Sequence, residues 1–521
     1  MKLPRKVLVA NRGEIAVRVI RTLRALGLRS VAVYSDADRD ALHVRLADEA
    51  ERIGPAPAAE SYLRGEAIVA AARARGADAV HPGYGFLSEN AAFAQQVEKA
   101  GLIFVGPTPK NIARLGDKLS ARSVLREAGL PPVPGSGSAV TREALRRTAQ
   151  ELGFPLLLKA VAGGGGKGIR IVRTAAELSS AFDAATSEAK SSFGSSDVIA
   201  ERYVEKARHV EVQVLGDGAG GVRLFFERDC STQRRLQKLL EETPSPAMTH
   251  ELREKLLLAA GRAVAAERYR GAGTLEFLLS QDGELYFLEM NTRIQVEHPV
   301  TEETTGADLV AEQIAIAAGA KLPRWKDDLA GTVLPPSGAA VEFRINAEDP
   351  SRDFAPSTGR ISSVRLPAGP GIRVDSALEV GTMVPPYYDS LLAKVVARGV
   401  DRGQAFARLR AALYELRLSG VATTVPLGLA LLEDEGLLRA QNHCQYLAER
   451  LGDARFLRGS LDSEEAPFVA AAAAWLRQAN AGSSPRARES TPPPATSGAP
   501  ASSAALSPWA LLQRFSLKES T

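Results

Sequence analysis

The chain has 521 residues, of which 45% are apolar and 24% charged, and its net charge is +4. This length predicts several domains, and so small a net charge disfavours a dedicated nucleic-acid binder. Two cysteines exclude a disulfide framework and a multi-cysteine zinc site. The start lacks the apolar stretch of a signal peptide, and no window reaches the ~18 apolar residues of a membrane span. We therefore expect a cytoplasmic protein that binds neither nucleic acid nor membrane.

Short apolar runs alternate with helical patterns over the first 115 residues. Strands are expected at 6–10, 30–34, 79–80 and 103–105, and helices at 14–26, 67–75 and 90–100. This alternation predicts a parallel sheet in a Rossmann-like layout. The first turn reads Asn11-Arg12-Gly13-Glu14 rather than GxGxxG, so dinucleotide binding is not expected there.

Two further regions and a tail follow. The second contains a strand ending in Lys159, a glycine-rich loop, a helix from Ala175, a strand at 210–214, a polar loop at 230–238 and a helix at 250–268. The third contains apolar runs at 341–346 and 381–394 and helices at 404–416 and 426–432. The Ala-, Pro- and Ser-rich composition of 460–521 predicts a mostly disordered tail. Its apolar cluster at 507–517 is either a frayed end or a docking peptide.

Segments 274–279 and 285–291 have the pattern of a β-hairpin, with Asp282-Gly283 as a two-residue type I′ turn. That turn places Glu276 opposite Glu289 and Thr274 opposite Asn291. One face would be apolar and the other polar: Leu275, Phe277, Leu279, Tyr286, Leu288 and Met290 against Glu276, Glu289 and Asn291. Opposed like charges are destabilising unless a cation lies between them. Oxygen ligands alone predict Mg²⁺ or Mn²⁺, shared with phosphate; a solvated polar face is the alternative.

The run of glycines after Lys159 predicts a mobile lid over a nucleotide, because successive glycine N–H groups can wrap phosphate oxygens. A flexible linker is the alternative. The run consists of Gly163, Gly164, Gly165, Gly166, Lys167 and Gly168.

Segment 293–299 (RIQVEHP) directly follows Asn291. Arg293 can bind a small oxyanion through paired donors, and Glu297 can act as a general base. A surface turn with an ion pair is the alternative, and His298 is expected to be structural. Segment 228–242 (RDCSTQRRLQKLLEE) has the composition of an exposed basic helix face or of a binding element.

Several longer motifs carry a family resemblance over residues 3–450. They are KVLVANRGEIAVRVIRT, HPGYGFLSEN, FVGP, GDK, KAVAGGGGKGIR, RHVEVQVLGD, FLEMNTRIQVEHPVTE, EFRINAEDP and VPPYYDSLLAK. On these motifs the chain resembles the biotin carboxylases of the ATP-grasp superfamily. The resemblance implies an α/β and α+β multidomain fold, with a Rossmann-like domain (1–115), an ATP-grasp domain (116–330, lid 133–204) and a mixed C-terminal domain (336–450).

The resemblance also implies an activity. ATP and bicarbonate would give carboxyphosphate, whose carboxyl group passes to biotin on a carrier protein, with Mg²⁺ or Mn²⁺ as the metal. The nucleotide set would be Lys118, Lys159, the loop from Gly163 to Gly168, Glu201, Arg202, Tyr203, Val204, His209, Gln233, Glu276, Leu278 and Glu289. The metal would be held by Glu276, Glu289 and Asn291. Lys238, Arg293, Gln295 and Val296 would hold bicarbonate, Glu297 would deprotonate it, and Arg344 would stabilise the biotin enolate.

One departure and one absence qualify this reading. Leu236 stands where the family usually has a ribose-contacting His, which predicts weaker ATP binding. The AMKM biotinylation motif is absent, so a separate carrier protein and separate carboxyltransferase subunits are expected, with a homodimer of this chain. The leading interpretation is the biotin carboxylase subunit of an acetyl-CoA or other acyl-CoA carboxylase. A subunit of a two-subunit pyruvate carboxylase and an inactive scaffold subunit are the alternatives.

Overall fold

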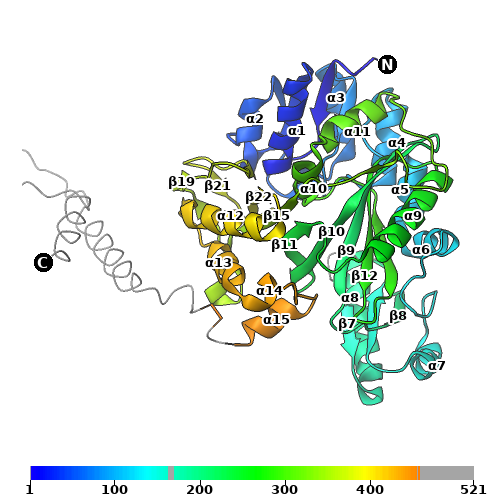
Figure 1. Cartoon of the computed structure of the whole chain (residues 1–521). Coiled ribbons are helices and arrows are strands. Elements are labelled where there is room, and N and C mark those ends of the chain that lie inside the picture. The colour runs from blue at the N-terminus through cyan, green and yellow to red at the C-terminus, as the bar shows by residue number, and fades with distance from the viewer. Residues whose placement is uncertain (1, 162–168, 454–455, 458–521) are drawn as a thin grey trace, which may run out of the picture. The chain divides into compact units, whose positions relative to one another are not determined.

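The computed structural model describes residues 2–161, 169–453 and 456–457 (Figure 1). The expected lid loop, 163–168, and the expected tail, 460–521, lie outside the described residues. The described residues all belong to one unit, Met1–Asp462. In the described part of the chain, no helix combines the length and the apolar content needed to cross a bilayer.

The N-terminal region is the expected parallel sheet, in the order β3-β2-β1-β4-β5. Its strands are β1 (Lys6–Val9), β2 (Arg29–Ser35), β3 (Glu49–Gly54), β4 (Ala79–His81) and β5 (Ile103–Phe104). Its helices are α1 (Gly13–Ala25), α2 (Leu42–Leu46), α3 (Gly65–Ala74), α4 (Ala91–Lys99) and α5 (Pro109–Gly116), with 3₁₀ turns η1 (Asp36–Asp38) and η2 (Ala58–Glu60). The sequence missed β3, α2 and α5, and the polar pattern of β3 does not resemble a buried strand.

Helix α1 illustrates how the pattern produces the packing. Ile15, Val19 and Leu23 recur at helical spacing and are buried. They join a cluster that includes Leu215 and Phe225 of the next region. This shared core attaches the N-terminal sheet to the central sheet, and each fully buried side chain of this size contributes about 1.5–3 kcal/mol.

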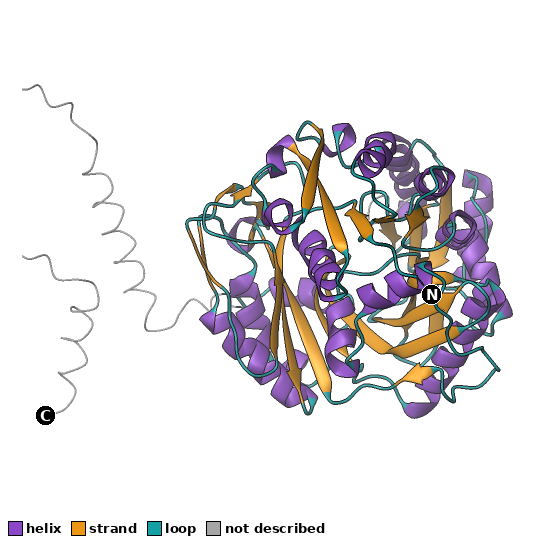
Figure 2. Cartoon of the chain, turned by 90° about the horizontal axis from the view of Figure 1, so that it is seen from above, coloured by secondary structure: helices purple, strands orange, loops and turns teal. Residues whose placement is uncertain are grey.

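The central sheet has the order β13-β12-β9-β10-β11-β15-β22-β20, with β14 paired to β10. Its strands before residue 335 are β9 (Arg208–Asp217), β10 (Val222–Arg234), β11 (Gln237–Thr243), β12 (Arg270–Leu279), β13 (Leu285–Asn291) and β14 (Val333–Leu334). The helices of this region are α6 (Lys118–Glu127), α9 (His250–Ala266), α10 (His298–Thr305) and α11 (Leu309–Ala317). Figure 2 shows helices at the edges of the molecule and others in its middle, between groups of strands.

A smaller sheet, in the order β7-β6-β8, stands apart from the central one within the predicted lid, 133–204. Its elements are α7 (Arg142–Leu152), β6 (Leu156–Ala160), β7 (Ile169–Val172), η3 (Ala175–Glu177), α8 (Leu178–Phe193) and β8 (Val198–Arg202). The glycine run lies in the sequence between β6 and β7, and these two strands pair antiparallel.

Three strands of the last region continue the central sheet, and the other six form three separate two-stranded sheets. Strand β15 pairs with β11, so the sheet crosses the predicted boundary at 330–336. The strands are β15 (Ala339–Asn346), β16 (Glu348–Asp349), β17 (Ala355–Pro356), β18 (Gly359–Arg360), β19 (Ser363–Arg365), β20 (Ile372–Ser376), β21 (Met383–Val384), β22 (Leu391–Gly399) and β23 (Arg417–Ser419). The helices are η4 (Pro350–Arg352), α12 (Arg402–Glu415), α13 (Val425–Glu433), α14 (Glu435–Leu438) and α15 (Tyr446–Leu451).

Candidate active site

The hairpin of β12 and β13 has the predicted register at its carboxylates. Glu276 lies opposite Glu289, and Thr274 lies opposite Asn291. Because β12 also pairs with β9, Glu276 lies between the strands β13 and β9. The sequence therefore located the opposed carboxylates correctly.

The predicted two-residue turn is wrong. The backbone N–H of Ser280 donates to the carbonyl of Glu284 at 2.9 Å, so the loop consists of Gln281, Asp282 and Gly283. Gly283 has a φ of 83°, the left-handed conformation that closes a hairpin loop of this length. A register shift after Glu276 then adds one residue to β13 and restores the predicted pairing at the carboxylates.

This shift corrects the predicted faces of the hairpin. Phe287, not Leu288, faces the core, where it contacts the ring of Phe277 with a centroid distance of 5.7 Å. Tyr286 lies opposite Leu278 and packs with it against a small cluster that contains Val204. The placement of Tyr286 and Leu288 on the core face is therefore wrong, because pure alternation does not foresee a bulge.

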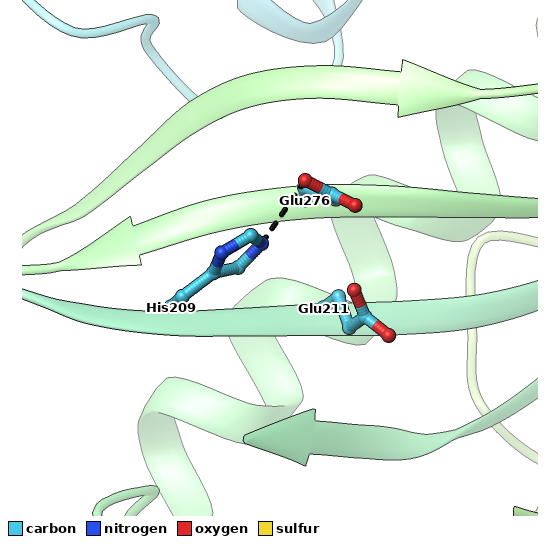
Figure 3. Close-up of side chains that lie close together, drawn as sticks. All are labelled: His209, Glu211 and Glu276. Atoms are coloured by element: carbon cyan, nitrogen blue, oxygen red, sulfur yellow. Dashed lines mark ion pairs between the residues drawn. The ribbon is translucent and has the colours of Figure 1, made fainter. Parts of the chain in front are cut away.

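Glu276 is buried among donors. Its carboxylate accepts hydrogen bonds from Lys238 Nζ at 3.0 Å, Gln295 Nε2 at 2.9 Å and Asn291 Nδ2 at 2.8 Å. His209 Nε2 lies 3.0 Å from its second oxygen, and Figure 3 shows these two side chains turned toward each other from neighbouring strands. Burial favours the neutral acid, but Lys238 and His209 outweigh it and hold the pKa of Glu276 well below its usual range.

Glu289 is the more open member of the pair, with 36% of its side chain exposed. Lys118 Nζ, at the start of α6, lies 3.8 Å from its carboxylate. Glu276, Glu289 and Asn291 thus offer oxygen atoms from adjacent positions, beside a lysine suited to phosphate. This donor set fits Mg²⁺ or Mn²⁺.

Lys238 connects these carboxylates to a second group. Its Nζ lies 2.5 Å from Glu211 and 2.6 Å from Glu297, in addition to its bond with Glu276. Glu297 is fully buried, and its other oxygen accepts from Arg344 Nη2 at 2.9 Å. Burial opposes ionisation, but these cations hold the pKa of Glu297 well below its usual range, so this carboxylate is ionised.

Arg293 reaches this centre from the loop after β13. Its Nε donates to Glu89 at 2.9 Å and its Nη2 donates to Asn291 Oδ1 at 2.9 Å. Glu89 belongs to the HPGYGFLSEN motif, so this ion pair ties the N-terminal region to the site. Because Gln295 and Glu297 are buried, the alternative of a surface turn for this segment is wrong. The Nδ1 of buried His298 lies 2.7 Å from the carbonyl of Gln295, as expected of a structural histidine.

Lys159 and Glu201 face each other across β6 and β8. Lys159 Nζ lies 2.7 Å from Glu201, whose other oxygen bonds to Arg122. Burial lowers the pKa of Lys159, whereas Glu201 partly restores it. The Glu201 side chain is therefore held by cations, and only its backbone remains for an adenine edge. The sequence did not foresee this orientation.

The remaining nucleotide residues lie on or near the strands β9, β10 and β12. Gln233 Nε2 lies 2.7 Å from His209 Nδ1, next to Glu276. Leu278, which is two residues after Glu276 on β12, packs with Val204 in a small apolar cluster. Arg202 is exposed and Tyr203 is half-buried beside that cluster. The carbonyl of Val296 accepts from Lys394 Nζ at 2.8 Å, so its backbone is already engaged.

Segment 228–242 is a β-hairpin rather than a polar loop or an exposed basic helix. Strands β10 and β11 pair up to Arg234 and Gln237, with Arg235 and Leu236 at left-handed φ values of 49° and 67° in the turn. Leu236 lies at the tip with half of its surface exposed. Basic residues in a strand can be buried where carboxylates face them.

Arg228 is such a residue, and the sequence missed its role. It is fully buried, and its Nε donates to Glu211 at 2.6 Å while its Nη1 donates to Gln213 at 2.9 Å. It thereby anchors Glu211, which in turn contacts Lys238. The alternation of His209, Glu211 and Gln213 along one face of β9 was the available signal.

Three family profiles match the chain in order. They describe the biotin carboxylase N-terminal domain over 3–112, the carbamoyl-phosphate synthase L chain ATP-binding domain over 117–325, and the biotin carboxylase C-terminal domain over 342–449. "Biotin carboxylase 1" of Bacillus subtilis is 50% identical over 445 residues, which cover 85% of this chain and 98% of that protein. The "biotin-dependent acyl-coenzyme A carboxylase alpha3 subunit" of Mycobacterium leprae is 49% identical over 438 residues, or 84% of this chain and 72% of that protein.

A solved structure is similar over the same range. The biotin carboxylase domain dimer of Hydrogenobacter thermophilus 2-oxoglutarate carboxylase, in complex with MgADP, ADP and bicarbonate, has a TM-score of 0.83 at 46% identity. The match covers 88% of this chain and 99% of that chain. Fold and site together define an ATP-dependent ligase of the ATP-grasp class. Within that class, the chain belongs to the biotin carboxylase family.

Proposed function

We propose that this chain carboxylates biotin on a separate carrier protein, with ATP and bicarbonate as its other substrates. The observation that carries the proposal is the position of Glu297. This buried carboxylate lies between Lys238 and Arg344, and Lys238 also contacts Glu276 of the opposed carboxylate pair. A carboxylate that can act as a base and the cations Lys238 and Arg344 therefore lie next to the oxygen atoms that suit a metal ion.

In this proposal Lys238 and Arg293 bind bicarbonate, with Gln295 and Val296 beside it. Glu297 takes the proton from bicarbonate, which then attacks the γ-phosphorus of ATP and releases ADP. The phosphorylated carboxyl group gains a leaving group that bicarbonate itself lacks. Arg344 then balances the negative charge that develops on the ureido oxygen of biotin as N1′ accepts the carboxyl group.

We assign the nucleotide to a second set of residues, which lies next to Glu276. Lys118 and Lys159 bind its phosphates, the glycines from 163 to 168 cover them, and Leu278 and Val204 pack against the adenine, with Glu201, Arg202 and Tyr203 along its edge. His209 and Gln233 lie toward the ribose and phosphates. Glu276, Glu289 and Asn291 hold Mg²⁺ or Mn²⁺, which when bound neutralises phosphate charge.

The assembly around the chain is the finer part of the proposal. A biotin carboxyl carrier protein supplies the biotin, and carboxyltransferase subunits consume the product. The match to an acyl-coenzyme A carboxylase subunit favours an acyl-CoA as the final acceptor, with pyruvate as the alternative. We further propose a homodimer in the cytoplasm, where Cys230 and Cys444 stay free thiols. The domain limits 1–115, 116–330 and 336–450 remain predictions for limited proteolysis.

The test is ATP hydrolysis by the purified chain with Mg²⁺, bicarbonate and free biotin, each omitted in turn. We expect phosphate release to need bicarbonate and to rise with biotin. ATP hydrolysis that ignores both compounds would contradict the proposal. Co-purification of the native carrier and transferase from the source cells, detected by mass spectrometry, tests the partners separately.

A further inference from the structure

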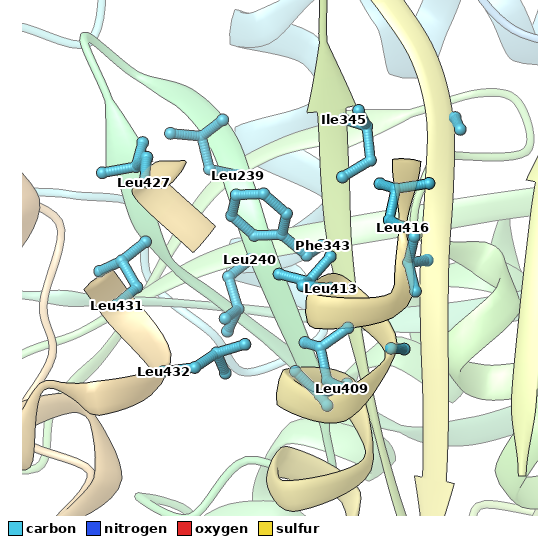
Figure 4. Packing of buried hydrophobic residues seen from close by; sticks show 14 of the residues in the cluster. Leu239, Leu240, Phe343, Ile345, Leu409, Leu413, Leu416, Leu427, Leu431 and Leu432 are labelled. Carbon is cyan, nitrogen blue, oxygen red and sulfur yellow. The ribbon is translucent and has the colours of Figure 1, made fainter. Parts of the chain in front are cut away.

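Two glutamates to which the mechanism assigns no role lie next to Arg344 in the central sheet. Glu241 on β11 and Glu342 on β15 are paired residues of neighbouring antiparallel strands. Their neighbours Leu240 and Phe343, also paired, point to the core under α12 and α13, as Figure 4 shows. Because side chains alternate along a strand, Glu241 and Glu342 point to the opposite face of the sheet, where Arg344 contacts Glu241 and Glu297.

Both glutamates are fully buried, and together they have few donors. Arg344 Nε donates to one oxygen of Glu241 at 2.6 Å. The second oxygen of Glu241 and both oxygens of Glu342 have no hydrogen-bond partner among the residues that the structure describes. A buried carboxylate without partners is costly, and two paired ones repel each other.

The surrounding charges do not neutralise a second carboxylate. Lys394 on β22 also acts on Glu342, but its Nζ lies 3.4 Å from Glu14 and 3.7 Å from Asp375 and is shared with them. The charged and titratable groups that face the pair are Lys238 on β11, Cys230 on β10, Arg344 on β15, Lys394 on β22, Glu297 before α10 and Tyr84. Lys394 and Tyr84 in turn contact Glu14 on α1. Arg344 is shared between Glu241 and Glu297, and Glu342 forms no ion pair among the residues that the structure describes.

Protonation resolves this imbalance. Burial raises the pKa of Glu342 well above its usual range and Glu241 adds to the rise, although Lys394 opposes it. Burial also raises the pKa of Glu241, to about 7, although Arg344 opposes the shift. Like-charged carboxyl groups in one buried site take up a proton between them.

We propose that Glu241 and Glu342 share one proton in the working enzyme and are positioning residues for Arg344. With that proton in place the pair presents a single negative charge to Arg344, which leaves its guanidinium free to balance charge on biotin. When the proton leaves to solvent at higher pH, a second negative charge appears behind Arg344. This charge attracts the guanidinium of Arg344 away from biotin. It also repels the negative charge that forms on biotin, which destabilises that anion. The inference rests on the proposed function, because that assigns Arg344 to biotin.

Glu342→Gln tests the pair, because glutamine has the shape of the protonated acid and cannot ionise. The measurement is kcat for biotin-dependent ATP turnover by the full chain between pH 6.5 and 9, at saturating free biotin. We expect the ratio of variant to wild type to rise with pH by about fivefold or more, as one full charge in a buried site requires. A purely structural role would lower the ratio equally at every pH.

Glu242→Gln is the matched control. Glu242 is the next residue on β11, is equally buried, and points to the other face, where Arg402 Nε binds it at 2.5 Å. Its ratio to wild type should stay constant over the same pH range. Glu241→Gln removes the same excess charge from the opposite strand and should reproduce the rise, so the test survives if one variant fails to fold.

The outcomes separate the two claims. A wild-type chain without biotin-dependent turnover at any pH would contradict the proposed function. A wild type that turns over biotin, with ratios for Glu342→Gln and Glu241→Gln that do not change with pH, would overturn the shared proton. Thermal unfolding gives an independent readout. The thermal midpoint of Glu342→Gln minus that of the wild type should increase as pH rises. An acid whose folded pKa is raised loses stability between its unfolded and folded pKa values, and glutamine does not.

Discussion

Replacing Glu297 by glutamine tests the assignment of the general base. The fully buried Glu297 carboxylate lies 2.6 Å from Lys238 Nζ and 2.9 Å from Arg344 Nη2. Glutamine keeps the shape and one acceptor oxygen but cannot take a proton. Loss of a positioned base costs about 10²- to 10⁴-fold in rate. We expect kcat for bicarbonate-dependent ATP turnover to fall by that factor.

The same structure predicts that the fold survives this change. Lys238 keeps Glu211 at 2.5 Å and Glu276 at 3.0 Å, and Arg344 keeps Glu241, so neither cation is left unpaired. The KM for ATP should change little, because the residues assigned to the nucleotide are not altered.

The assay is phosphate release at saturating ATP and bicarbonate, together with a thermal melt of each variant. Glu303→Gln is the control, because Glu303 lies on α10, the helix that follows Glu297, and contacts only Arg373, at 3.4 Å, among the ion pairs found in the described part of the chain. We expect it to retain wild-type turnover. A Glu297→Gln enzyme with more than a tenth of the wild-type kcat would refute the reasoning.

Three further predictions concern metal, nucleotide and pH. Glu289→Gln should raise the Mg²⁺ concentration for half-maximal turnover about tenfold or more, since one anionic ligand is lost. Glu284→Gln, near the hairpin loop, is the control and should leave that concentration unchanged. If Glu289→Gln and the wild type need the same Mg²⁺ concentration, Glu289 is not a metal ligand. Leu236→His should lower the KM for ATP by a factor of a few to about ten, the value of one neutral hydrogen bond of roughly 0.5–1.5 kcal/mol, and an unchanged KM would place the ribose elsewhere. Burial lowers the pKa of His43 and His81 to about 4, so stability should fall as pH drops from about 6.5 toward 4. The thermal midpoints of wild type and His43→Asn should converge on acidification, and a constant gap between them would contradict a neutral buried His43.

Local patterns predicted most of what lies within one motif. The opposed Glu276 and Glu289 followed from a hairpin whose two strands are adjacent in the sequence. The turn chemistry was misjudged, because Asp282-Gly283 also suits a longer loop with glycine at its end. The bulge that compensates for this loop leaves no mark in an alternating pattern.

Contacts between distant segments could not be predicted in the same way. Glu241 and Glu342 are opposed only because β11 pairs with β15, about a hundred residues further along the chain. The burial of Arg228 likewise depends on Glu211 of a different strand. Sequence shows the charge of such residues, but partner and burial depend on which strands pair and in which register.

The most direct test of the central claim follows the carboxyl group itself. The purified chain is incubated with ATP, Mg²⁺, isotopically labelled bicarbonate and free biotin, and labelled carboxybiotin is measured beside ADP. We predict that label enters biotin only when ATP is present, with ADP formed alongside, and that Glu297→Gln abolishes both. ATP hydrolysis without any label in biotin, in a wild-type chain that is folded and binds Mg-ATP, would contradict the assignment of this site to biotin carboxylation.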